Sequence, residues 1–258
     1  MNHIREIYNY RDMIFSLAQR ELRGKYEKSV LGFLWSFLSP LFQIIIYNMV
    51  FTMVFHNDMP NYYIFLMTGL LPWTFFADSL AQATGAIIYN AEMVKKIYFP
   101  REVLVIAEVL AKLINMLLSF IVMAFFLIVS RVGFSVHLVL LPLVILSEFL
   151  FALGCAFLAA SITVYLRDLE YVINVILMAW VWGTPIMYDL FSVQDPFLQK
   201  ILHLNPMTSI IQSYHYILYN HIYPPVTDIA SPMAEGIIMV LIGYWVFRKL
   251  NRRFVEEL

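Results

Sequence analysis

The sequence has few charged residues and almost no cysteine. Of its 258 residues only 14% are charged and 61% are hydrophobic, whereas in an ordinary soluble domain about a quarter of the residues are charged. The single cysteine, Cys155, excludes a disulfide framework or a cysteine metal site within one chain. We therefore expect a membrane protein that folds without disulfides.

The sequence also lacks the short motifs of several enzyme classes. It has no G-x-x-x-x-G-K-[ST] phosphate loop, because Gln19 stands where Gly24-Lys25 would need the first glycine. The six histidines are scattered without metal-ligand spacing, and there is no Gly-x-Ser-x-Gly elbow. We predict no catalytic residue, no metal site and no cofactor bound by this chain.

Long uncharged stretches are the main positive signal. Four of them have close to the ~20 residues that a helix needs to cross a ~30 Å hydrocarbon layer. Two further apolar stretches contain one acid each, Asp78 and Glu235. The predicted spans are 31–55, 62–84, 105–130, 138–166, 170–188 and 231–248. The sequence thus predicts an all-α polytopic membrane protein with six transmembrane helices and a single domain, 1–258.

The basic residues predict the orientation of these spans. Fifteen of the 17 Lys and Arg residues fall on one side of the predicted membrane, and Arg131 and Lys200 fall on the other. Because cytoplasmic loops carry an excess of Lys and Arg, the positive-inside rule places both termini in the cytoplasm.

Three segments are predicted to be helical without crossing. Residues 12–26 form an amphipathic helix that lies in the interface, with apolar and basic residues on different faces. The loop 86–99 suits a short helix along the cytoplasmic surface. Residues 196–220 are apolar and aromatic but divided by Asn205-Pro206, so we expect two short re-entrant helices on the outer side.

Several residues within the spans carry more specific expectations. Pro72 should kink or break the second span, because proline lacks the backbone N–H. Glu108 and Lys112 are four residues apart, which favours an ion pair on one helix. Glu148 is the deepest acid. A packing hydrogen bond is favoured there over a proton relay, for which no chain of partners is visible.

Six short motifs occur in order along the chain. They are Arg20-Glu21-Leu22-Arg23 with Tyr26, Ser29 to Trp35 and Pro40; Gly69 to Phe76; Lys95 to Arg101; Arg167-Asp168; Thr184 to Tyr188; and Leu204 to Met207. Together they resemble the bacterial polysaccharide ABC exporter permeases, which export O-antigen or teichoic acid. The resemblance covers essentially the whole chain, although the outer loop between spans 1 and 2 is short.

The resemblance implies a homodimer of permeases joined to two copies of a separate ATPase, which binds ATP and Mg²⁺. Such a complex moves a lipid-linked polysaccharide across the bacterial inner membrane, through a channel lined by spans 1 and 5. The loop 86–99 resembles the coupling helix that docks into the ATPase: Asn90, Glu92, Met93, Val94, Lys95, Lys96 and Ile97. The outer pair at 196–220 resembles the gate helices that close the channel, with Asn205, Pro206 and Met207 at the turn.

Aromatic residues in spans 1 and 5 are the candidate channel lining, because sugar C–H faces stack on aromatic rings. They are Trp35, Phe37, Phe42, Tyr47, Tyr171, Trp180, Trp182 and Tyr188. Tryptophan and tyrosine also gather at the interfaces of ordinary membrane proteins, so a packing role stays open for each. Two other functions stay open as well, a membrane-embedded transferase acting on a polyprenyl lipid and an ion-coupled carrier that uses Glu148.

Overall fold

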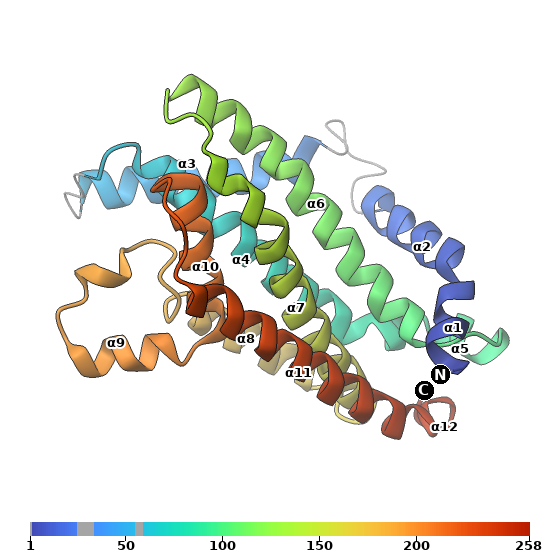
Figure 1. The fold of residues 1–258 in the computed structure, drawn as a ribbon. Helices are drawn as coiled ribbons and strands as arrows, with labels where there is room; N and C mark the ends of the chain where they lie inside the picture. The colour runs from blue at the N-terminus through green and yellow to red at the C-terminus, as the bar shows by residue number, and fades with distance from the viewer. Residues whose placement is uncertain (1, 25–33, 55–58) are drawn as a thin grey trace.

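The structure is a computed structural model that describes residues 2–24, 34–54 and 59–258. These residues form helices and turns without a strand, which confirms the predicted all-α class (Figure 1). The longer helices are α2 (Arg11–Gly24), α3 (Trp35–Met53), α4 (Tyr62–Tyr89), α6 (Glu102–Val129), α7 (Leu141–Thr163), α8 (Leu169–Trp180) and α11 (Val226–Asn251). The shorter elements are α1 (Asn2–Asn9), α5 (Ala91–Lys96), η2 (Val136–Leu140), η3 (Leu190–Ser192), α9 (Pro196–His203), α10 (Pro206–Tyr214), the π-helical turn η4 (His215–Tyr219) and α12 (Phe254–Glu257).

Four helical segments among the described residues are long and apolar enough to cross a membrane. They are α4, α6, the continuous segment of η2 and α7, and α11. Helices α3 and α8 are apolar but shorter. Helix α8 ends at Trp180, well before the predicted end of its span at 188. The cause is local, because Pro185 has no N–H to donate and disfavours helical geometry at Thr184.

Helix α4 is the most deeply buried of the long helices and packs on α3, α6, α7, α8 and α10. It runs through Pro72 without ending, which excludes the break that was one of the two expected outcomes, while the expected kink stays a prediction. The hydroxyl of Thr68 donates a hydrogen bond to the carbonyl of Phe65, and the hydroxyl of Thr74 donates one to the carbonyl of Leu71; both bonds are 2.8 Å long. The packing of neighbouring helices around α4 lets it keep this interior proline.

Helices α7 and α11 pack side by side along much of their length (Figure 1). A Cβ atom added to Gly243 of α11 would lie 2.3 Å from the carbonyl oxygen of Gly154 in α7. One added to Gly154 would lie 2.4 Å from the backbone carbon of Met239. Small residues let membrane helices approach this closely, so both glycines are needed for the contact.

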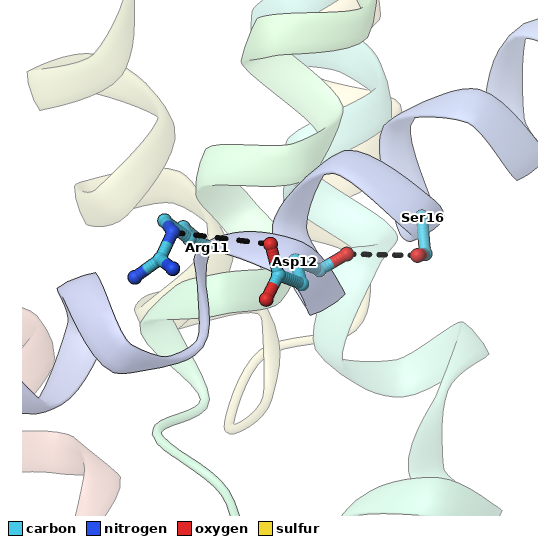
Figure 2. Close-up of polar contacts among 3 residues, drawn as sticks. All are labelled: Arg11, Asp12 and Ser16. Carbon is cyan, nitrogen blue, oxygen red and sulfur yellow. Dashed lines mark hydrogen bonds and ion pairs between the residues drawn. The ribbon is translucent and has the colours of Figure 1, made fainter.

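Helix α2 corresponds to the predicted interface helix 12–26, whose residues 25–26 lie outside the described part. Figure 2 shows its first turn, where Ser16 Oγ donates a 2.7 Å hydrogen bond to the carbonyl of Asp12. Arg11 Nε lies 3.8 Å from the Asp12 carboxylate. Both charged side chains are largely exposed, so this pair adds little stability. An acid in the first turn suits the helix dipole.

The packing of α2 on α6 changes one predicted ion pair. Lys112 Nζ lies 3.2 Å from the carboxylate of Glu21 in α2, and not in the expected pair with Glu108. The expectation considered residues of one helix, whereas tertiary packing brings Glu21 to the nearly buried Lys112.

Both chain ends lie near α1, α5 and α12, at the end of the molecule opposite α9 (Figure 1).

Candidate functional site

A cavity of about 500 Å³ lies where α8 ends and the chain turns toward α9. It brings together four residues that the sequence singled out: Trp180, Trp182, Tyr188 and Asn205. Three are candidate channel aromatics from span 5, and Asn205 belongs to the predicted gate. The rest of the wall is largely apolar and comes from the segment around α9: Val193, Leu198, Ile201 and Leu202.

Asn205 holds the end of α8 against the start of α10. Its Oδ1 accepts hydrogen bonds from the backbone N–H of Met207 and from the indole N–H of Trp180, both at 3.0 Å. Its Nδ2 donates to the carbonyl of Gly183 at 3.0 Å and to Thr184 Oγ1 at 2.9 Å. One amide therefore caps α10 and closes the turn after α8, so the gate sequence acts as a structural clamp.

The two tryptophans at this cavity differ in how they are held. Trp180 is half-buried and packs edge-on against Trp73 and Phe76, with centroid distances of 6.3 and 5.2 Å. Trp182 is 61% exposed. Tyr188 is half-buried, and its hydroxyl donates a 3.2 Å hydrogen bond to the carbonyl of Trp182. Trp182 thus presents the freest ring face, while Trp180 is mainly a packing residue.

The predicted gate helix α10 belongs to the core. Met207, next to the turn, has no exposed surface, and nor does Tyr214 at the other end of α10. Tyr214 donates a 2.6 Å hydrogen bond to Glu148 of α7. The acid on which the ion-coupled alternative rested is therefore fully buried and held by a tyrosine in the packed interior, which is the packing role that the sequence favoured.

Beyond α10, the chain is anchored again at His215. Its Nδ1 lies 2.9 Å from Thr68 Oγ1, and its Nε2 lies 3.2 Å from the carbonyl oxygen of Pro185. The imidazole stacks on Phe65 at 4.0 Å. Sequence reasoning missed Tyr214 and His215 as anchors. The signal was present, since polar aromatic side chains in an apolar segment need hydrogen-bonding partners when buried.

Three of the span 1 candidates, Trp35, Phe42 and Tyr47, do not line this cavity. Trp35 and Phe42 lie on an exposed stripe of α3 that continues through Ile46 and Met49. Tyr47 packs against the core instead, and its hydroxyl accepts a 3.0 Å hydrogen bond from Gln43. The side chain of Phe37 lies outside the described part. Tyr171, 74% exposed, is at the opposite end of α8 from the cavity.

A second, polar cavity of about 240 Å³ lies between α3, α4 and α6. Its polar lining is unusual for a space among apolar helices. Asn115 Oδ1 is buried there without a hydrogen-bond partner among the described residues. The polar lining residues are Ser39, Gln43, Thr74, Asp78, Lys112, Asn115 and Ser119. The arrangement can accept hydroxyl groups or water.

The predicted coupling segment contains α5, and its residues divide into two groups. Val94 is only 6% exposed and packs into the core, and Met93 is partly buried against it. Lys95 is exposed, and Lys96 forms a 2.6 Å ion pair with Glu92 on the surface. Ile97 is 58% exposed and therefore free to contact another protein.

The coupling segment is also tied to two other elements. Arg20 of α2 donates a 2.9 Å hydrogen bond to Asn90, the residue just before α5. The hydroxyl of Tyr89, at the end of α4, donates to the carboxylate of Glu170 in the first turn of α8. The two residues just before α5 are therefore hydrogen-bonded to α2 and to α8, the helix that ends at the aromatic cavity.

Comparison with known proteins assigns this arrangement to a family. A family model described as "ABC-2 type transporter" matches residues 13–219. The chain belongs to this family. Over 256 residues it is 34% identical to the O-antigen export system permease protein RfbA of Myxococcus xanthus, covering 99% of this chain and 98% of that protein.

Two further relatives have related names. An O-antigen export system permease protein RfbA of Klebsiella pneumoniae is 32% identical over 248 residues, covering 96% of this chain and 95% of that protein. The polysialic acid transport protein KpsM of Escherichia coli is 26% identical over 209 residues, covering 76% and 77%. The sequence resemblance is thereby confirmed. With its long apolar helices, this ABC-2 family member is a multi-pass transporter permease.

Proposed function

We propose that this chain is the membrane subunit of an ATP-driven exporter that moves a lipid-linked polysaccharide, such as O-antigen or teichoic acid, across the bacterial inner membrane. The full-length similarity to the O-antigen export permeases supports the substrate class. The geometric observation that carries the proposal is the aromatic cavity formed by Trp180, Trp182 and Tyr188. ATP and Mg²⁺ bind to the partner ATPase.

An aromatic wall suits a moving sugar chain. Each sugar ring offers apolar C–H faces that stack on an aromatic ring without a fixed set of hydrogen bonds. The polysaccharide can therefore slide past Trp182 one sugar at a time. The polar cavity between α3, α4 and α6 would hydrogen-bond sugar hydroxyls at a deeper level, through Gln43 and Asp78.

The path is completed by a second copy of the chain. Helices α3 and α8 each carry an exposed apolar stripe, which includes Trp35 and Phe42 on α3 and Tyr171 and Met178 on α8. In the proposed homodimer these stripes face the partner permease or the sugar chain. In this proposal α3 and α8 complete six spans, α8 together with the non-helical segment 181–188 that follows it, and both termini lie in the cytoplasm.

The contacts of α5 suggest how ATP drives the movement. Ile97 and its exposed neighbours dock into a groove of the ATPase. When the ATPase closes on ATP, it moves α5. The hydrogen bonds Arg20–Asn90 and Tyr89–Glu170 pass that movement to α2 and to the start of α8. Because α8 ends at Trp180 and Asn205, its displacement alters the aromatic cavity and the clamp at the gate.

The composition of the complex tests this proposal. We expect the tagged permease, purified in mild detergent, to bring an ABC ATPase with it. Native mass spectrometry should give two permeases and two ATPases. The permease separated from its partner should not hydrolyse ATP. A permease that is stable and active without an ATPase would refute the proposal.

A further inference from the structure

A third cavity, of about 640 Å³, opens at the end of the molecule where both termini lie. Its lining residues come from the coupling segment, the start of α6, the end of α11 and α1. The proposed function uses the coupling segment on one side of this cavity but assigns no role to its other walls, which come from α1, α6 and α11. Its charged lining consists of Glu6, Lys95, Lys96, Arg101, Glu102, Arg248 and Arg252, so that five basic residues face two acids.

Most of these basic residues have no carboxylate partner of their own. Lys96 pairs with Glu92. Within the described part of the chain, Lys95, Arg101, Arg248 and Arg252 have no carboxylate oxygen within 4.0 Å. Arg248 lies instead over the ring of Tyr244, at 5.9 Å. Uncompensated cations around one cavity favour an anion from outside the chain.

Of these four basic residues, Arg101 has the guanidinium that is held most firmly in place. Its Nη1 donates to the backbone carbonyl and to the side-chain Oδ1 of Asn251, at 2.5 and 2.6 Å, and its guanidinium lies 5.9 Å from the ring centroid of Phe254. Both hydrogen-bonding partners are neutral. Partial burial lowers the pKa of Arg101 below its ordinary value. The hydrogen-bonding partners thus hold the guanidinium in place without neutralising it, and the charge of Glu102 offsets the effect of burial on the Arg101 pKa only in part.

We propose that this cavity binds the phosphate of an anionic phospholipid from the cytoplasmic leaflet. Arg101, Arg248 and Arg252 contact the phosphate oxygens, because guanidinium groups match phosphate geometry and donate two hydrogen bonds at once. Basic pockets between membrane helices on the cytoplasmic side are suited to acidic headgroups.

The position of the cavity selects a lipid over a soluble anion. Arg101 immediately precedes α6 and Arg248 lies in the last turns of α11, and both helices are long and apolar enough to span the membrane. These side chains therefore lie at the depth of the headgroups. The cavity also has an apolar wall suited to the glycerol and first acyl carbons: Ile7, Val94, Phe99 and Pro100.

The end of α11 offers a matched pair of variants. Arg248 and Arg252 line the cavity, whereas Lys249 and Arg253 do not, although all four are exposed at the same helix end. Arg248→Gln/Arg252→Gln and Lys249→Gln/Arg253→Gln therefore remove the same charge from the same place. We would titrate the full-length permease, purified with the subunits that accompany it, with phosphatidylglycerol and phosphatidylcholine and count bound lipids by native mass spectrometry.

The wild-type protein should retain phosphatidylglycerol in preference to phosphatidylcholine. Arg248→Gln/Arg252→Gln should weaken that binding about 30-fold, because each basic residue near the membrane surface contributes about 1 kcal/mol and two are removed. Lys249→Gln/Arg253→Gln should bind as the wild type does. Equal weakening in both pairs would mean diffuse attraction to the membrane surface and would overturn the proposal.

Two other results would also overturn it. Displacement of phosphatidylglycerol by inorganic pyrophosphate at equal concentration would show a site for soluble anions. Loss of the ATPase from the Arg248→Gln/Arg252→Gln variant, with lipid binding unchanged, would show that the cavity is a protein contact. In either case the proposed export function would stand, since it does not depend on this cavity.

Discussion

The indole N–H of Trp180 in α8 donates a 3.0 Å hydrogen bond to Oδ1 of Asn205, which caps α10. Through this contact a residue predicted to line the channel and one predicted to form the gate become parts of one clamp. Their roles are therefore coupled. A change at Asn205 should loosen the end of α8 as well as the start of α10.

Replacing Asn205 by Ala should lower the stability of the permease more than a simple helix-cap mutation does. The change removes four hydrogen bonds, each with a net contribution of about 0.5–1.5 kcal/mol, so we expect a loss of about 2–6 kcal/mol. Thermal unfolding of the purified protein in detergent measures this. Asp195→Ala is the matched control, because Asp195 also caps a helix that starts with proline but bonds only locally. Its expected cost is about 1 kcal/mol. Equal losses in the two variants would contradict the clamp.

Trp182 and Trp180 should respond differently to the same substitution. Trp182→Leu keeps apolar area but removes ring stacking, so export should slow by up to about tenfold without a change in melting temperature. Trp182→Tyr should stay close to the wild type. Trp180→Leu should lower the melting temperature, because it loses the hydrogen bond to Asn205 and the contacts with Trp73 and Phe76.

The readout for the tryptophan variants is the amount and length of exported glycan. Long chains should suffer more than short ones in Trp182→Leu, since each sugar passes the same ring. If Trp182→Leu exports chains of normal length at a normal rate, this ring faces lipid and the proposed lining is wrong.

Gly243→Ala should destabilise the contact between α7 and α11. Its new Cβ would meet the backbone carbonyl of Gly154 at 2.3 Å, which only a shift of one helix can relieve. We expect a cost of about 1–3 kcal/mol, typical of overpacking. Gly24→Ala is the control, because nothing lies within 4 Å of a Cβ there. Unchanged thermal stability in Gly243→Ala would show that the two helices pack less closely than described.

In the coupling segment, the structure separates two substitutions that look alike in sequence. Ile97→Asp places a charge on an exposed position and should detach the ATPase while the permease stays folded. Val94→Asp buries a charge in the core of the permease itself and should reduce its yield and stability. Copurification of the ATPase, with the melting temperature of the permease alongside, distinguishes the two. A complete complex with Ile97→Asp would mean that α5 does not dock into the ATPase.

Local sequence patterns were enough to predict the helical class, because long uncharged stretches at a membrane leave helices as the simplest way to satisfy the backbone. The patterns failed where neighbours decide the outcome. Pro72 was expected to kink or break the second span, and packing around α4 carries the helix past it without a break. Lys112 looked paired with Glu108, but α2 brings Glu21 to it.

The candidate site was predictable only where its residues are close together in the sequence. Residues close in sequence, such as Trp180, Trp182 and Tyr188, do line one cavity. The clamp at Asn205 and the Glu148–Tyr214 contact join segments far apart in the chain, and periodicity within one helix carries no information on such pairs. The exposed stripe of α3 needs a partner that a single chain does not contain.

The most direct test of the proposed function is transport by purified components. The permease and its ATPase would be reconstituted into liposomes with a fluorescent lipid-linked glycan, and the glycan reaching the opposite leaflet would be measured with an impermeant lectin. We predict movement only when both subunits and hydrolysable ATP are present, with no effect of an imposed proton or sodium gradient. Movement by the permease alone, or movement driven by an ion gradient without ATP, would contradict the account.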